Sequence, residues 1–494
     1  MKKLKELFSD TLLYGISSVL ARFINYLLVP LHTNVFSRDQ YGVVGLVYAA
    51  IALLNVVFTF GMESAYLRYA KDREKARDVF KTLQLSLLAF ASVLTAALWL
   101  GEPLLRPLMG LDAANADIYL FMLGILWFDA LGIVPFAELR LVRRTVTYVA
   151  LRTVNVLINL GLNVYLILSL GWGLPAVFLA NLAASVLTTL ALWVITGPML
   201  RGDWQRGLLR QALYFGFPFV PAGIGFTMNE MLDRYLLEHY MSPATTEMLY
   251  GTGMDSTDVV GIYNACYKLA VFMLLVIQMF RMAWQPFFLR HADDPEAPKL
   301  YSEAFRYFNL AAGAVFLAVA LFAEQIVQIR IPVLDMYLVD AKFWSGLHVV
   351  PLLLGAYWFH GWYMNFSAGI FIREKTRVLG YITLGGAAIT LAANLLLIPW
   401  MGMTGSAAAT LLSYAAMALM LYYKSMQVYE VPYAMKRAVL TMAVAACCVL
   451  YAPDLVQLVN SEWMGRFIML GLGGAGIAAA GLWGRGFSLE SRSD

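Results

Sequence analysis

The sequence contains few cysteines and few charged residues for its length. Of its 494 residues, 14% are charged and three are cysteines, Cys266, Cys447 and Cys448. This number excludes a disulfide framework, and the spacing matches no metal-ligand motif. The sequence also lacks a nucleotide-binding loop, a His/Cys/Asp/Glu metal cluster and a nucleophile–base motif. We therefore expect no enzymatic activity, no cofactor, no bound metal and no nucleic-acid partner.

Apolar residues dominate the chain instead. They make up 61% of it, and the mean hydropathy is +0.68, which is too high for a soluble domain. About fourteen apolar runs have the length of roughly 20 residues that a helix needs to cross the hydrocarbon core. The sequence thus predicts an all-α polytopic membrane protein. The expected spans are 10–31, 41–62, 82–103, 116–138, 147–169, 174–197, 210–232, 259–286, 304–325, 346–370, 377–399, 404–423, 433–452 and 465–484.

Lysines and arginines are concentrated in every second gap between these runs. Cytoplasmic loops carry this excess, so the basic gaps and both termini are expected to be cytoplasmic. The longest outer loops, about 235–258 and 326–345, are too short for a folded catalytic domain. We therefore expect function to reside within or between the helices. The densest basic group contains Arg68, Lys71, Arg73, Lys75, Arg77 and Lys81.

Two motifs recur six spans apart in the same order. Such a parallel repeat predicts two six-helix lobes that face each other across a central cavity. The lobes would comprise residues 1–200 and 201–425, with the last two spans and the tail in 426–494. The matching pairs are Asp39-x2-Gly42-x5-Tyr48 with Asp258-x2-Gly261-x5-Tyr267, and Asn163-x7-Gly171 with Asn394-x7-Gly402.

Two cations lie deep within apolar runs and break the charge pattern. Arg22 lies near the middle of the first run, with Asn25 on the same helical face. Lys268 lies in the eighth run, one turn from Asn264. An unpaired cation at this depth costs on the order of 2.5–3.5 kcal/mol, so it must face water, an anion or a carboxylate. These residues either form a cavity for an anionic group or make a structural ion pair, for which Asp129 is the candidate partner.

Further polar residues have two interpretations each. Arg152 and Arg281 lie near the cytoplasmic ends of their runs, where they either snorkel to the headgroups or make the first contact with a phosphate. Asn155, Asn159 and Asn163 form a stripe with a spacing of four residues. The stripe either hydrogen-bonds neighbouring helices or lines a wet cavity for sugar hydroxyls.

Four acidic residues within or beside the spans are candidates for ion coupling: Asp129, Glu63, Glu230 and Asp233. The last two lie near the outer end of the seventh run, which favours solvation by water over an ion-coupling role. The same run contains two prolines and three glycines within 216–225. This composition predicts a bent helix.

Several segments resemble the bacterial polysaccharide-export flippases of the Wzx type, and the likeness extends over most of the chain. The segments are Leu20 through Tyr69 with Phe36-Ser37-Arg38-Asp39-Gln40-Tyr41-Gly42, then Gly261 to Asn264, Phe280 to Phe287, and Asn394 to Pro399 followed by Gly402 and Gly405. That family belongs to the MOP superfamily, together with multidrug-and-toxin exporters of the MATE type and peptidoglycan-precursor flippases. The resemblance implies a MATE-like, two-lobed, fourteen-helix fold that works by alternating access in the bacterial inner membrane.

The resemblance further implies an undecaprenyl-pyrophosphate-linked oligosaccharide as substrate, with membrane lipids and polysaccharide polymerase machinery as partners. The buried cations would then hold the pyrophosphate, because an arginine fork binds phosphate oxygens bidentately. Three alternatives stay open. A peptidoglycan-precursor flippase would use the same cationic cavity, and a multidrug exporter would need more buried carboxylates. A glycolipid polymerase or ligase would need larger outer loops.

Overall fold

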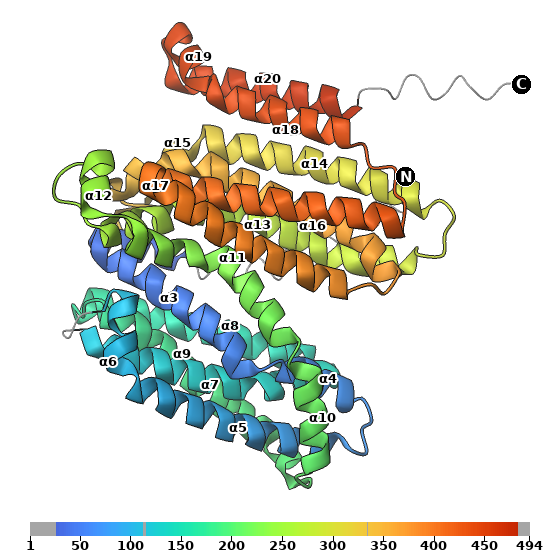
Figure 1. Ribbon diagram of the computed structural model, residues 1–494. Helices are drawn as coiled ribbons and strands as arrows, with labels where there is room; N and C mark the ends of the chain where they lie inside the picture. The colour runs from blue at the N-terminus through green and yellow to red at the C-terminus, as the bar shows by residue number, and fades with distance from the viewer. Residues whose placement is uncertain (1–25, 112–114, 333, 483–494) are drawn as a thin grey trace, which may run out of the picture. The chain divides into compact units, whose positions relative to one another are not determined.

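The computed structural model describes residues 26–111, 115–332 and 334–482 (Figure 1). Arg22, Asn25 and most of the first expected span lie outside these residues. The described chain is almost entirely helical. Its strands are β1 (Arg330–Ile331) and β2 (Met336–Tyr337), which pair antiparallel with Arg330 opposite Tyr337. The expected all-α polytopic membrane fold is confirmed.

The apolar runs coincide with helices wherever the chain is described. Among the described residues, nine helices are long and apolar enough to span a membrane, or ten if the bent pair α18–α19 is one span. One of them, α17 (Arg377–Val428), has 52 residues and would be roughly 78 Å long, far more than the hydrocarbon core of roughly 30 Å. It contains a non-helical residue, Gly402, with φ 52° and ψ −129°. The break lies between the two spans expected at 377–399 and 404–423.

The chain packs as two compact units, and the division falls within α13 after Asn264. We call the described residues up to Asn264 the N-terminal unit and those from Ala265 onward the C-terminal unit. The predicted lobes, 1–200 and 201–425, divide the chain at a different point because they follow the sequence repeat and the units follow packing.

The N-terminal unit is a helical bundle around α7, which packs against α3, α5, α8 and α9. The central helix is apolar on nearly all sides, as a buried helix must be. The helices are α2 (Leu28–Val35), α3 (Arg38–Thr59), α4 (Met62–Tyr69), α5 (Ala76–Leu100), α6 (Glu102–Leu105), η1 (Pro107–Met109), α7 (Ala116–Leu141), α8 (Thr145–Val164), η3 (Tyr165–Ser169), α9 (Pro175–Thr196), η4 (Gly197–Arg201), α10 (Arg206–Gly216), α11 (Phe219–Tyr240), α12 (Pro243–Tyr250) and the start of α13 (Ser256–Arg290).

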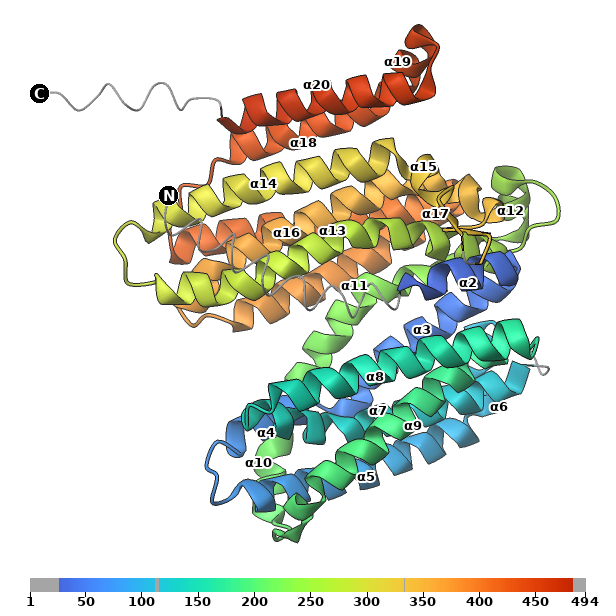
Figure 2. The same cartoon turned by 180° about the vertical axis from the view of Figure 1, so that it is seen from behind.

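In the C-terminal unit, α16 packs against α17 and α14, and the pair α18 and α20 covers α14 (Figure 2). Its core contains a buried amide, Asn309, whose Oδ1 accepts hydrogen bonds from the indoles of Trp358 at 2.9 Å and Trp362 at 2.7 Å. The helices after α13 are α14 (Ala297–Leu321), α15 (Ala323–Val327), η5 (Ala341–Val349), α16 (Val350–Ile372), α17, α18 (Met435–Leu450), α19 (Ala452–Val459) and α20 (Glu462–Leu482).

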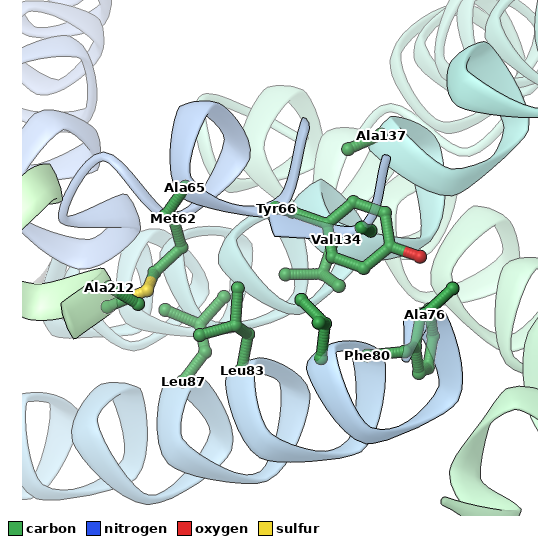
Figure 3. Close-up of a cluster of buried hydrophobic side chains, with 12 residues drawn as sticks. Met62, Ala65, Tyr66, Ala76, Phe80, Leu83, Leu87, Val134, Ala137 and Ala212 are labelled. Carbon is green, nitrogen blue, oxygen red and sulfur yellow. The ribbon is translucent and has the colours of Figure 1, made fainter. Parts of the chain in front are cut away.

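A buried apolar cluster ties the basic end of the N-terminal unit together (Figure 3). It joins α4, α5 and α7 with a single residue of α10, Ala212. The ring of Tyr66 is fully buried among these side chains. The cluster therefore anchors α10 and the break that follows it.

The expected bend of the seventh run is confirmed as a break between α10 and α11. The first helix ends at Gly216, and the second begins at Phe219 with Pro218 as its N-cap. A second break, between α3 and α4, packs against it, because a Cβ on Gly61 would lie 2.7 Å from the carbonyl oxygen of Gly216. Gly61 has φ 66°, a left-handed conformation that favours glycine.

The repeated glycines lie at a close crossing of α3 and α13. A Cβ on Gly42 would overlap the backbone oxygen of Thr257, and a Cβ on Gly261 would overlap that of Arg38. Each glycine thus faces the residue four positions before the other glycine. Farther along the same crossing, Gly45 faces the side chain of Asn264. Only residues without a side chain let two helix backbones approach this closely.

The two copies of the second repeated motif have the same local structure. The Nδ2 atoms of Asn163 and Asn394 each donate to the carbonyl oxygen four residues earlier, at 2.8 Å in both cases. The glycines that close the motifs, Gly171 and Gly402, both have positive φ, 66° and 52°. The two copies of the motif therefore fold alike.

The crossing predicts opposite effects of one substitution at two glycines. Gly261→Ala should destabilise the protein by about 1–3 kcal/mol, because the new methyl group meets backbone that is unable to turn aside. Gly161→Ala, in α8, should be neutral or stabilising by up to about 1 kcal/mol, because no atom lies within 4 Å and alanine favours the helix. The measurement is the thermal unfolding midpoint of the purified protein in detergent. Equal midpoints for the two variants would contradict the close crossing.

Candidate functional site

The most deeply buried charges in the described chain form an ion pair in α11. Asp233 and Arg234 are only 1% and 3% exposed. The Nη1 atom of Arg234 donates to Oδ1 of Asp233 at 2.8 Å and to the carbonyl oxygen of Glu230, also at 2.8 Å. The backbone N–H of Arg234 donates to the same carboxylate oxygen at 2.9 Å.

The start of α13 completes this cluster. The hydroxyl of Tyr263 donates to Oδ2 of Asp233 at 2.8 Å. The Nε atom of Arg234 donates to Oδ1 of Asn264 at 3.5 Å, and Asn264 in turn faces Gly45 of α3. We refer to Asp233, Arg234, Tyr263 and Asn264 as the outer charge cluster, because the charge pattern predicts that the ends of these helices lie on the outer side.

The cluster corrects the expectation that water solvates Asp233. The residue lies roughly 10 Å along the helix from the end of α11 at Tyr240. At that point α13 lies beside α11 and covers the carboxylate. The distance of Asp233 from the end of its span therefore did not predict its exposure to water. Glu230 is half-buried. Arg234 was not singled out from the sequence, although a second charge beside Asp233 in an apolar run was the available signal.

The asparagine stripe of α8 makes helix–helix hydrogen bonds. Asn155 donates to the hydroxyl of Thr188 in α9 at 3.0 Å. Asn163 donates to Oδ1 of Asn159 at 2.9 Å, and its own Oδ1 lies 3.0 Å from Nε2 of His32 in α2. These contacts match the first of the two interpretations of the stripe.

Asp129 and Arg152 lie within electrostatic reach of each other in the N-terminal unit. Asp129 is half-buried and hydrogen-bonds Ser185. Arg152 is exposed, and its guanidinium stacks over the ring of Phe136 with the carbon 4.0 Å from the ring centroid. The pairing of Asp129 with Arg22 stays a prediction, since Arg22 lies outside the described residues.

Lys268 and Arg281 belong to the part of α13 in the C-terminal unit. Lys268 is half-buried, four residues after Asn264 in the same helix. Arg281 is exposed and acts electrostatically on His360 of α16. Asp233 and Asn264 therefore come together with Arg234 in the N-terminal unit.

A second charge cluster lies at the basic end of the N-terminal unit and was not predicted. Arg73, in the loop after α4, donates to both carboxylate oxygens of Glu138 in α7, at 3.0 and 2.6 Å. The hydroxyl of Tyr66 donates to the same carboxylate at 2.7 Å. Hydrogen bonding to Glu138 raises the pKa of Arg73 above its ordinary value. Nearby, Glu63, one of the ion-coupling candidates, forms a salt bridge with Arg140.

Comparison with known proteins identifies a family. Residues 7–291 match the family model described as "Polysaccharide biosynthesis protein". A search of curated proteins finds no match.

Solved structures of several transporters share the fold. The lipid II flippase MurJ, in an inward closed conformation, has a TM-score of 0.70 at 12% identity, with 95% of this chain and 99% of that chain covered. An inward-facing multidrug resistance MATE family transporter of the MOP superfamily has a TM-score of 0.66 at 15% identity, covering 83% and 93%. A MOP superfamily transporter from Pyrococcus furiosus has a TM-score of 0.60 at 15% identity, covering 86% and 95%. This chain therefore has the fold of the MOP superfamily.

The second cluster predicts unequal effects for its two charged partners. Arg73→Met should cost about 1–3 kcal/mol, because it leaves a buried carboxylate with one donor. Glu138→Gln should cost less than about 1 kcal/mol, because Tyr66 keeps its acceptor and the 46% exposed side chain of Arg73 turns to water.

Thermal unfolding in detergent measures both effects. Lys75→Met, which removes a cation from an exposed pair in the same loop, is the matched control and should leave the midpoint unchanged. A loss for Glu138→Gln as large as that for Arg73→Met would contradict the asymmetry.

Proposed function

The chain belongs to the polysaccharide biosynthesis protein family, and on that premise we propose that it is a flippase for a lipid-linked saccharide. Its substrate is an undecaprenyl-pyrophosphate-linked oligosaccharide, which it moves from the cytoplasmic to the outer leaflet. The product would enter polysaccharide synthesis, such as that of lipopolysaccharide O-antigen. The protein acts as a transporter and not as an enzyme. Polysaccharide polymerase machinery is the expected downstream partner.

The observation that carries this proposal is the family match over residues 7–291, combined with cations placed inside membrane spans. A pyrophosphate carries several negative charges, and its passage through hydrocarbon requires compensating positive charge. Among the proteins with this fold, one is named as a flippase of lipid II. A multidrug exporter, in contrast, would need carboxylates for organic cations, and Asp233 and Glu138 are both already paired with arginines.

The cations would contact the pyrophosphate at different depths in the membrane. Arg152 and Arg281, near the cytoplasmic ends of their helices, would make the first contact with the pyrophosphate. Arg22 and Lys268 would hold it at mid-depth, with Asn25 and Asn264 as neighbouring hydrogen-bond partners. Asn155 and Asn159 would hydrogen-bond the sugars after giving up their present hydrogen bonds to Thr188 and Asn163. The polyprenyl chain stays in the membrane lipid throughout.

Alternating access requires helices that change direction without breaking their packing. The paired breaks at Gly61 and Gly216 supply such a point in the N-terminal unit, since two backbone interruptions lie against each other there. Among the ion-coupling candidates, Glu63 is paired with Arg140 and Asp233 with Arg234, and Asp129 lies near mid-depth of its span.

The charge pattern predicts that both termini lie in the cytoplasm, and the resemblance to the export flippases implies the inner membrane. Alkaline phosphatase fused to the C-terminus should therefore be inactive, and a fluorescent protein fused there should fluoresce. The same phosphatase inserted after Gly251, in the outer loop before α13, should be active. Phosphatase activity at the C-terminus would contradict the proposed orientation.

Translocation of the substrate tests the function itself. In inverted membrane vesicles or proteoliposomes supplied with undecaprenyl-pyrophosphate-linked oligosaccharide, Arg22→Ala and Lys268→Ala should each reduce the transport rate about tenfold or more, because each removes a charge that compensates the pyrophosphate. Arg330→Ala is the matched control, since it removes an exposed arginine of an outer loop. Its rate should equal that of the wild type.

Two results would contradict the proposal. Normal transport by both cavity variants at normal expression would exclude the anion-binding role of Arg22 and Lys268. Transport of lipid II by the wild type, with none of the oligosaccharide substrate, would assign the chain to the peptidoglycan-precursor branch.

A further inference from the structure

We propose that Arg234 is a further phosphate-binding residue of this transporter, and that Asp233 occupies its guanidinium until the substrate phosphate replaces the carboxylate. The inference rests on the proposed function, which supplies a multiply charged headgroup. Both residues lie in the outer charge cluster and within the N-terminal unit.

The first support is the local character of the ion pair. Neighbouring residues on a helix point about 100° apart, so their side chains do not normally face each other. Arg234 reaches Asp233 only by folding back along α11, where it also bonds the carbonyl oxygen of Glu230. Its bond to Asn264 in α13 is 3.5 Å long, at the weak end of the hydrogen-bond range. Movement of the guanidinium away from Asp233 therefore breaks these two bonds within α11 and the longer bond to Asn264.

The second support is that Asp233 stays hydrogen-bonded without the guanidinium. Its Oδ2 accepts from the hydroxyl of Tyr263 at 2.8 Å, and its Oδ1 accepts from the backbone N–H of Arg234 at 2.9 Å. Loss of one partner from a buried pair is usually costly because the other charge is left bare. Here two donors remain on the carboxylate, so the cost of releasing Arg234 is reduced.

The third support is that the cluster lies next to the crossing of α3 and α13. Asn264 lies between Gly45 of α3 and Arg234 of α11. If α3 moves away from α13, Asn264 loses the contact that confines it, and the guanidinium becomes accessible. A phosphate then offers two oxygens and more charge than one carboxylate, which the planar fork of arginine binds bidentately.

The test measures binding of undecaprenyl pyrophosphate to the purified full-length protein in detergent, with undecaprenol as the uncharged reference lipid. Arg234→Gln should weaken binding about tenfold, because a phosphate contact is lost. Asp233→Asn should tighten binding about tenfold, because the competing carboxylate is removed while Arg234 keeps its charge. Asp233→Ser is a second neutral replacement for the case in which the asparagine variant does not fold.

The exchange is supported if the affinity for undecaprenyl pyrophosphate falls in Arg234→Gln and rises in Asp233→Asn. A pair with a structural role alone moves both affinities in the same direction or leaves them unchanged, and either outcome overturns the inference. Glu102→Gln, which removes the carboxylate partner of Arg106 at 2.9 Å, is the matched control and should not alter the affinity. Tighter binding by this control would attribute the effect to net charge and would also overturn the inference.

A different outcome separates this inference from the proposed function. If the wild type binds undecaprenyl pyrophosphate no better than undecaprenol, the proposed substrate is wrong, and the exchange is wrong with it. If the wild type prefers the pyrophosphate and the variants do not diverge, the proposed function stands and only the role of Arg234 is excluded.

Discussion

A polar group in the hydrocarbon core must find its partner inside the protein, because water is absent there. In the N-terminal unit two buried carboxylates are satisfied by the same kinds of partner. Asp233 is bonded by Arg234 and the phenol of Tyr263, and Glu138 is bonded by Arg73 and the phenol of Tyr66. In each cluster a guanidinium and a phenol thus donate hydrogen bonds to one buried carboxylate.

The two clusters nevertheless differ in what they connect. Arg73 comes from a loop and is 65 residues from Glu138, so its ion pair joins segments that are distant in the sequence. Breaking it would release the loop from α7. Arg234 is instead the neighbour of Asp233, and its ion pair lies within one helix. The first arrangement stabilises the fold, whereas the second holds a charge in place without joining helices through that pair.

The sequence predicted the spans well because hydrocarbon thickness imposes a length and a composition on every helix that crosses it. The bend at Pro218 was predictable for a similar reason, since proline removes a backbone donor. Burial of Asp233 was not predictable in this way. Distance from the end of a span says nothing about which other helix returns beside it, and α13 is the helix that covers Asp233. The bond from Arg73 to Glu138 was missed because Arg73 looked like one more cation of a basic loop.

The sequence repeat explains why the crossing of α3 and α13 is regular and where it is not. Gly42 and Gly261 each face the residue four positions before the other, as expected for two copies of one helix that pack symmetrically. In the same register Gly45 corresponds to Asn264, and Ala49 corresponds to Lys268. The second copy therefore carries a polar residue at two positions where the first copy has a small one. Small residues at those positions preserve close packing, whereas polar residues inside a membrane are retained at a cost that packing does not require. The two copies of the helix therefore share the glycines of the close crossing and differ at the positions of Asn264 and Lys268.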